Sequence, residues 1–304
     1  MTAVGLVGFG RWGKLIFRDL RALGAEVHVA VPNAAAQAAA LTAGAASVHS
    51  DCRNLPRLDG YVIAVPTVHH AEIALHLLDR NCPLFIEKPL CDNPADALRL
   101  VELAGDRIFV MDKWRYHPGI EEIGRLARSG ALGDILSIRT YRLGWGNPHD
   151  DVDATWILMP HDLSIVIEIL GHLPAARAAH FDGAGLRDSG MIGFLRDADG
   201  PDVVVEVSAL HPVARRSVLV IGTIASVQLQ HSQDDRIFLS AYPPVQGTPP
   251  AEIVVGTEMP LHRELSAFLS YLRGGPAPRS NSAEGLQVVV RIAELQALAR
   301  VGRS

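Results

Sequence analysis

The chain has 304 residues, of which 48% are hydrophobic and 20% are charged, and its formal net charge is −5 at pH 7. These proportions are those of a globular protein and argue against global disorder. The acidic balance and the absence of any lysine or arginine run argue against nucleic acid or an anionic membrane as a partner.

The cellular compartment is predicted from the lack of targeting signals and from the spacing of the cysteines. No apolar stretch approaches the roughly 18 residues that span a bilayer, and the N-terminus lacks the basic region and cleavage site of a signal peptide. The three cysteines, Cys52, Cys82 and Cys91, are widely spaced and form no CxxC pattern. This spacing argues against a disulfide framework and against a zinc site. We therefore expect a cytoplasmic protein that makes no membrane contact.

The first motif is a glycine-rich turn. Residues 4–7 predict a buried strand, and Gly8-Phe9-Gly10-Arg11-Trp12-Gly13 and a periodic helical run follow at once. In this context Gly8 permits a tight turn, Gly10 lets a pyrophosphate approach the backbone, and Gly13 lets helix and strand pack closely. The free N–H groups at the helix start would hold phosphates. We predict that these six consecutive residues bind a dinucleotide, with a plain glycine-rich turn as the alternative.

The end of the second predicted strand, residues 27–31, leaves the choice of cofactor open. An acid there would bind the ribose 2′-hydroxyl of NAD, but this strand ends in Pro32-Asn33. Asn33 can bond either a hydroxyl or a phosphate, and Arg11 can stack on adenine or meet a 2′-phosphate. The cofactor is therefore NAD or NADP, and Arg11 favours NADP.

A third buried strand, residues 61–65, ends in Pro66-Thr67-Val68-His69-His70 and a helix. We expect Pro66, Thr67 and His70 to lie at the cofactor edge. Two adjacent histidines raise the possibility of a metal, but neighbours in sequence point to different faces of a helix. A polar helix start is the preferred interpretation, and we predict no metal.

The stretch Leu84-Phe85-Ile86-Glu87-Lys88-Pro89-Leu90 combines a buried strand with charge. Open α/β sheets place their chemistry at the carboxyl ends of parallel strands, and proline fixes the backbone direction there. The alternative is a solvated strand end. Because strands and helices alternate up to the strand at residues 108–111, the first part of the chain predicts a doubly wound parallel sheet.

The pattern changes from about residue 135. Short strand-like runs follow one another without helices, which predicts an open, mostly antiparallel sheet. They lie at residues 135–145, 178–181, 191–195, 203–209, 217–221, 227–230 and 236–239. One long helix, residues 156–170, interrupts them and carries His161 inside an apolar run, either as a core histidine or as a functional one. Helices at 261–272 and 283–300 close the chain, and we expect domains at 1–117 and 118–304.

Together these motifs resemble one family in order and spacing, the glucose–fructose oxidoreductase / inositol dehydrogenase (Gfo/Idh/MocA) family. The motifs are Gly8-x-Gly10-x-x-Gly13, the Pro66-to-His70 turn, Glu87-Lys88-Pro89, the His161-Asp162 helix and the closing helix from Glu284-Gly285 to Arg300. Leu132 to Ile135 and Trp156 to Ser164 look most like the subgroup near sugar-nucleotide and polysaccharide biosynthesis. The resemblance implies a Rossmann domain, then an α/β domain whose open sheet is often buried in a homodimer or homotetramer, with the last helix returning toward the first domain.

The resemblance also implies a site. Glu87-Lys88-Pro89 would lie beside the nicotinamide, often with a cis Lys–Pro bond, and His161 would face Lys88. Members mostly oxidise or reduce a secondary hydroxyl or ketone of a sugar, cyclitol or sugar nucleotide. The chemistry fits, because hydride leaves carbon only as the hydroxyl proton is removed, and histidine is a suitable base. An ammonium at the substrate oxygen stabilises the developing alkoxide, so Lys88 and His161 are the predicted catalytic residues, with Glu87 positioning Lys88.

The predicted substrate-binding residues are Trp114, Arg115, Tyr116, Trp156 and Asp153. Aromatic side chains can form a platform for a carbohydrate-like substrate, and core packing is the equal alternative.

One position departs from the family pattern. Members commonly carry an acid four residues before the helix histidine, on the same face, and here that residue is Ile157. Asp153, or Asp150 and Asp151, would have to substitute, since Glu168 is two turns along from His161. The run from His149 to Asp153 could bind a metal, but a solvated acidic loop is the preferred interpretation.

Three functions follow from these observations. The first is an NAD(P)-dependent oxidoreductase acting on a carbohydrate-like alcohol or ketone. The second is an imine or other carbonyl reductase of specialised metabolism, in which the loss of the acid at Ile157 adapts the site to a different reaction. The third is a catalytically silent NAD(P)-binding sensor or partner subunit, with Ile157 as the trace of lost catalysis.

Overall fold

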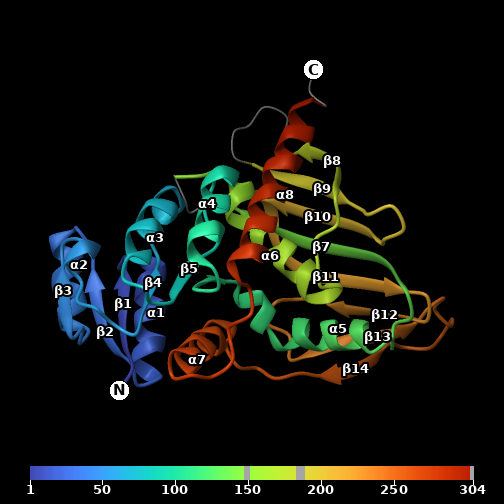
Figure 1. Ribbon diagram of the computed structural model, residues 1–304. Helices are drawn as coiled ribbons and strands as arrows, with labels where there is room; N and C mark the ends of the chain where they lie inside the picture. The colour runs from blue at the N-terminus through green and yellow to red at the C-terminus, as the bar shows by residue number, and fades with distance from the viewer. Residues whose placement is uncertain (147–150, 183–188, 302–304) are drawn as a thin grey trace. The chain divides into compact units, whose positions relative to one another are not determined.

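The computed structural model describes residues 1–146, 151–182 and 189–301. It divides into two compact units, shown in Figure 1. The first unit holds Met1–Lys113 and Met259–Val289, and the second holds Trp114–Glu258 and the chain from Val290 onward. The expected domains, 1–117 and 118–304, differ from this division mainly because residues 259–289 return to the first unit. No helix in the described ranges has the length and apolar character needed to cross a membrane.

The first unit is built on a six-stranded sheet. Its strands have the order β3-β2-β1-β4-β5-β6, and every pairing is parallel. The elements are β1 (Ala3–Val7), α1 (Arg11–Ala22), β2 (Glu26–Ala30), α2 (Ala34–Thr42), β3 (Ser47–His49), β4 (Gly60–Ile63), α3 (His70–Leu78), β5 (Leu84–Glu87), α4 (Pro94–Ala104), β6 (Ile108–Met111) and α7 (Pro260–Leu272). This order confirms the predicted doubly wound sheet, and its switch point lies between β1 and β4. β3 was not predicted, since its three half-buried residues carry no apolar pattern.

The glycine turn after β1 has the close approaches that its sequence predicts. Gly8 has a φ of +101°, and a Cβ there would lie 2.1 Å from the carbonyl oxygen of Ala64. A Cβ on Gly13 would lie 2.4 Å from the Gly8 carbonyl oxygen. Both glycines are therefore required so that α1 can start directly against the sheet.

Helix α7 completes the core of the first unit. Its buried residues are Leu261, Glu264, Leu265, Phe268 and Leu269, which is the spacing of one helix face. The Phe268 ring stacks on Phe85 of β5, with centroids 4.8 Å apart. α7 also packs against α1, so a segment far along the chain seals this sheet.

Helix α8 (Ser282–Val301) begins against the same sheet. The Glu284 backbone N–H donates to Asn281 Oδ1 at 3.0 Å, and Glu284 Oε2 accepts from the Asn281 N–H at 3.2 Å. This is a reciprocal cap. Gly285 follows because a Cβ there would lie 2.8 Å from Val110 Cγ2 of β6. The Glu-Gly pair thus caps the helix and lets it approach the strand.

The second unit is an eight-stranded sheet with helices on one face (Figure 1). The strand order is β14-β13-β12-β11-β7-β10-β9-β8, antiparallel except for the β10–β7 pair. The elements are α5 (Pro118–Arg128), β7 (Ile135–Trp145), α6 (Ala154–Leu170), β8 (Ala176–Phe181), β9 (Gly190–Leu195), β10 (Asp202–Ser208), β11 (Leu210–Gly222), β12 (Ala225–Leu229), β13 (Arg236–Ala241) and β14 (Ala251–Val254). The predicted mostly antiparallel sheet is confirmed.

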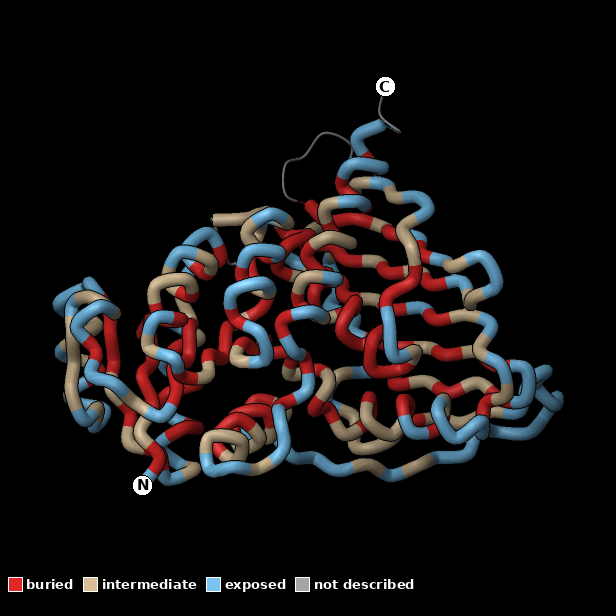
Figure 2. Tube along the Cα trace, in the orientation of Figure 1, coloured by how far each residue is buried: buried red, intermediate tan, exposed pale blue. Residues whose placement is uncertain are grey.

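Burial alternates along these strands, as Figure 2 shows. Thr140, Val205 and Val218 are buried beneath the helices, whereas Arg139 and Phe194 are exposed. Two elements were not predicted. α5 starts at an unusual cap, His117, whose Nδ1 accepts from the Gly119 N–H at 3.1 Å, and β14 is an exposed edge strand without an apolar face.

A buried ion pair ties α6 to the sheet. Arg142 Nε of β7 lies 2.5 Å from Asp162 Oδ2, and their side chains are 5% and 1% exposed. The Arg142 guanidinium also lies over the Trp114 ring, 4.5 Å from its centroid. Burial raises the pKa of Asp162, and Arg142 opposes that rise. One cation therefore holds a carboxylate of α6 and an indole together.

Gly8→Ala should lower the free energy of unfolding by about 2–4 kcal/mol, because the strain of its positive φ adds to the clash with Ala64. Urea denaturation measures this. Gly144→Ala is the matched control, since a Cβ at Gly144 meets nothing within 4 Å. Equal losses in both variants would contradict the explanation.

Arg142→Met should cost about 3–5 kcal/mol of unfolding free energy, because it leaves the Asp162 carboxylate buried without its cation. The double variant Arg142→Met/Asp162→Leu should recover most of this loss. Arg196→Met, which breaks an exposed pair with Asp202, should cost less than about 1 kcal/mol. Denaturation curves followed by tryptophan fluorescence give the unfolding free energy of all three variants. If Arg142→Met lost no more unfolding free energy than the Arg196→Met control, the stabilising role of the buried pair would be refuted.

Candidate functional site

The start of α1 presents its backbone to open space. Gly10 is the N-cap residue, and no side chain caps the helix. Gly10 is exposed, and a Cβ built on it would meet nothing within 4 Å. The first N–H groups of a helix have no partners within it, so they can bind an anion at this point. The turn therefore fits the pyrophosphate of a dinucleotide.

The other predicted cofactor residues in this region have different surroundings. Phe9 is buried and packs edge-on against Phe17, with ring centroids 5.4 Å apart, so it belongs to the core. Arg11 is exposed. Asn33 caps α2 by accepting from the Ala36 N–H at 2.9 Å, which leaves its side-chain N–H groups as donors. No acidic side chain follows β2 to select NAD.

The turn after β4 is tied to the segment that follows β5. Pro66 is exposed, whereas Thr67 and His70 are buried. His70 Nδ1 lies 2.9 Å from the Pro89 carbonyl oxygen, and Nε2 lies 3.0 Å from that of Val65. Both ring nitrogens are thus engaged by the backbone, and His70 shapes this edge of the sheet.

Lys88 lies at the carboxyl end of β5. Its Nζ is 3.9 Å from Glu87 Oε2, and the two side chains are 9% and 14% exposed. The Lys88–Pro89 peptide bond is cis. An ammonium held here, with little solvent around it, can stabilise negative charge strongly.

Two further carboxyl groups interact electrostatically in this region, because Glu87 and Asp112 both act on Glu264, and we call Glu87, Asp112 and Glu264 the carboxyl cluster. Burial raises the pKa of Glu87, although Lys88 and Lys113 oppose the rise. Burial raises the pKa of Glu264 well above its ordinary value, and Glu87 adds to the rise. Lys113 lies over the Trp12 ring, 4.5 Å from its centroid. A lysine–carboxyl network therefore underlies the end of β5.

Sequence reasoning missed Glu264, although a signal for it exists. A glutamate at a core-facing position of an amphipathic helix is unusual, and Glu264 falls between Leu261 and Phe268 in that spacing. The importance of Asp112 and Lys113 depends on β6 pairing with β5, which the sequence pattern does not specify.

In the second unit, α6 carries the predicted histidine. Asp153 caps the helix by accepting from the Thr155 and Trp156 N–H groups at 2.9 and 3.2 Å, and its Oδ2 accepts from Gln296 Nε2 at 2.9 Å. Its carboxylate is therefore already committed to cap and tether the helix. His161 is half-buried one turn along from Ile157, which is buried.

The predicted substrate residues are mostly enclosed. Trp114, Tyr116 and Trp156 are buried, which favours the core-packing alternative over a carbohydrate platform. Arg115 Nε lies 3.1 Å from Glu168 Oε2, and Arg128 contacts the same carboxylate, so Glu168 is held away from other roles.

Metal binding finds no support among the described side chains. None of the described histidines, cysteines, aspartates and glutamates form a group of three that could hold an ion. Within the acidic run, Asp151 and Asp153 are described, whereas His149 and Asp150 lie outside the described residues.

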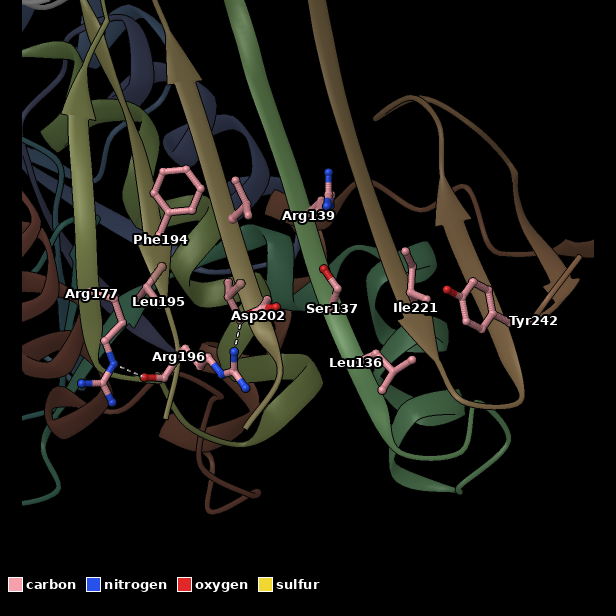
Figure 3. Close-up of a pocket in the computed structure, with 12 residues that line it drawn as sticks. Leu136, Ser137, Arg139, Arg177, Phe194, Leu195, Arg196, Asp202, Ile221 and Tyr242 are labelled. Atoms are coloured by element: carbon pink, nitrogen blue, oxygen red, sulfur yellow. Dashed lines mark hydrogen bonds and ion pairs between the residues drawn. The ribbon is translucent and has the colours of Figure 1, made fainter. Parts of the chain in front are cut away.

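A hollow on the second unit is lined by other residues. Figure 3 shows it on the sheet, with Arg139 and Ser137 of β7 on one side of β10 and Phe194 of β9 on the other. Arg177 donates to the Arg196 carbonyl oxygen at 2.6 Å along one side. None of the predicted site residues lines this hollow.

Comparison with known proteins identifies the first unit. Residues 2–109 match a family model described as oxidoreductase family, NAD-binding Rossmann fold (GFO_IDH_MocA). An inositol 2-dehydrogenase of Corynebacterium glutamicum (strain R) is 29% identical over 147 residues, 45% of this chain and 44% of that protein. An inositol 2-dehydrogenase of Rubrobacter xylanophilus is 32% identical over 172 residues, 52% of this chain and 48% of the relative. The chain spans about half the length of these relatives.

Solved structures share the fold of the whole chain. Levoglucosan dehydrogenase, in complex with NADH and levoglucosan, superposes with a TM-score of 0.84 at 19% identity, covering 99% of this chain and 97% of that one. UDP-N-acetylglucosamine 3-dehydrogenase from Acidithiobacillus ferrooxidans has a TM-score of 0.85 at 17% identity, covering 99% and 98%. Residues 2–109 thus match the NAD-binding Rossmann domain of the GFO_IDH_MocA oxidoreductase family, and the chain as a whole shares the fold of these dehydrogenases.

Proposed function

We propose that this protein is an NAD(P)-dependent oxidoreductase that transfers a hydride to or from a secondary alcohol or ketone of a sugar, cyclitol or sugar nucleotide. Lys88 stabilises the alkoxide or transfers its proton, and His161 is the acid or base. The observation that carries this proposal is the position of Lys88. It is a nearly buried ammonium at the carboxyl end of β5, in the same sheet whose first strand leads into the open glycine turn.

Relatives support the substrate class. Proteins similar to this chain are named inositol 2-dehydrogenase, and solved neighbours are named levoglucosan dehydrogenase and UDP-N-acetylglucosamine 3-dehydrogenase. Their names share a polyhydroxylated ring as the group acted on. We propose the same class for this chain, without an acid at Ile157 to assist His161.

The proposed cofactor is NAD or NADP. The cofactor supplies the hydride acceptor or donor when bound, and this chain's residues orient it. Gly10 and the start of α1 would hold the pyrophosphate, with Arg11 and Asn33 toward the adenosine. The lack of an acid after β2 and the exposed cation of Arg11 favour NADP. The predicted homodimer or homotetramer would form through the open face of the eight-stranded sheet.

Gly10→Ala should weaken binding of reduced NAD or NADP at least tenfold, because the new Cβ occupies the space through which phosphate reaches the helix start. Fluorescence titration with both cofactors measures the affinity. Since nothing lies within 4 Å of that Cβ, thermal unfolding should stay close to that of the Gly144→Ala control. Unchanged affinity would place the cofactor elsewhere.

Lys88→Met should lower kcat by about 10²- to 10⁴-fold on any substrate that the wild-type protein turns over, while cofactor affinity is retained. Formation of reduced cofactor is followed with a panel of sugars, cyclitols and sugar nucleotides. Lys14→Met, on the exposed side of α1, is the control and should keep full activity. Cofactor binding with no turnover of any panel member would favour the silent sensor instead.

A further inference from the structure

The carboxyl cluster combines buried acids with lysines. Glu87 interacts electrostatically with Lys88 and Lys113, and Glu264 interacts with Glu87, Lys113 and Asp112. A charged carboxylate in a buried site is costly, because water no longer solvates it. Protonation of a buried carboxyl group removes that cost.

Packing brings the faces that carry Glu264 and Glu87 together. Phe268 follows Glu264 by four residues and therefore lies on the same face of α7. Phe85 precedes Glu87 by two residues and therefore lies on the same face of β5. The Phe268 and Phe85 rings stack 4.8 Å apart, so these two faces meet, and Glu87 acts on Glu264 as a like charge.

Burial raises the pKa of Glu87, and the polar groups around it oppose that rise. Lys88 Nζ is 3.9 Å away, and Lys113, the Lys88 backbone N–H and the Trp12 indole also favour the carboxylate. These groups come from β5, from the segment after β6 and from α1.

The surroundings of Glu264 favour its protonated form. Its side chain is 1% exposed, and its Oε2 has no hydrogen-bond partner among the described residues. Glu87 and Asp112 act on it as like charges, and Lys113 opposes them.

We propose that Glu264 is a positioning residue that carries the proton of the carboxyl cluster, so that Glu87 stays ionised and holds the Lys88 ammonium at the end of β5. Its catalytic consequence rests on the function proposed above. Its protonation does not, and the two can be tested separately.

The lysine composition makes a direct test possible. The chain has only three lysines, Lys14, Lys88 and Lys113, so growth with [ε-¹³C]lysine labels both cations of the cluster and one lysine outside it. Lysine-to-arginine variants assign the three NMR signals. Glutamine has the shape of a protonated glutamate, so Glu264→Gln changes the charge only where Glu264 is ionised.

The two carboxyl groups should respond differently. Near neutral pH, Glu264→Gln should leave the Lys88 and Lys113 signals at their wild-type positions, whereas Glu87→Gln should shift both. The Lys14 signal should not move in either variant. Glu102→Gln, an exposed glutamate of α4, is the control. Shifted Lys88 and Lys113 signals in Glu264→Gln near neutral pH would show that Glu264 is ionised and would overturn the proposal.

Stability gives an independent readout. Folding raises the pKa of Glu264 above its unfolded value, so the wild-type protein loses stability as the pH rises from the unfolded pKa through the folded one. Glu264→Gln removes that loss, and its melting temperature should rise relative to wild type with increasing pH. A constant difference across the range would contradict the proposal.

Catalysis is tested last, on a substrate found with the panel. Glu264→Gln should change the alkaline limb of the kcat/KM profile, because the proton can no longer leave. A purely structural role would lower activity by the same factor at every pH, and that result would overturn the positioning role. If no panel member is turned over, the proposed function fails while the NMR and melting measurements still decide the protonation.

Discussion

The stack of Phe268 on Phe85 joins α7 to the central sheet of the first unit. It joins a helix from residues 260–272 to a strand near residue 85, and both rings belong to the core that includes Phe17 and Leu265. Burying two aromatic rings stabilises the unit on its own account. It also determines which face of α7 meets the sheet, and through that face a glutamate reaches the end of β5.

The chemistry at β5 therefore depends on a segment that lies far along the chain. Lys88 is positioned by its own strand, by the Glu87 carboxylate and by the Pro89 carbonyl that His70 contacts. Glu87 in turn raises the pKa of Glu264 on α7. In a site with little water, each charge alters its neighbours strongly, so the lysine is better understood as part of a network than as one residue.

The second unit depends on a different kind of contact. The pair between Arg142 and Asp162 is buried, and it connects the helix that carries His161 to the central strand of the sheet. Asp153 and Gln296 fasten the start of the same helix. Polar contacts thus hold α6 in register along an apolar surface, where hydrophobic packing alone is less directional.

Much of the fold was readable from periodicity. The alternation of strands and helices and the Gly8 turn reflect local chemistry and are found where they were predicted. The elements that were missed have weak local signals. β3 and β14 are short edge strands, and α5 begins at a histidine cap instead of the usual serine or aspartate. Residues 259–289 pack with the first unit through contacts that are distant in sequence, and no local sequence pattern encodes such contacts.

The sequence by itself determined the Rossmann order and the placement of Lys88 at a strand end, because strand period, glycine spacing and turn residues are properties of neighbours along the chain. Only the tertiary structure decided that Phe9 is core, that Asp153 is a cap and that Trp114 stacks with Arg142. It also decided that Glu264 is buried in the core of the first unit. These facts depend on which distant surfaces pack together, and burial then sets the charge of the groups between them.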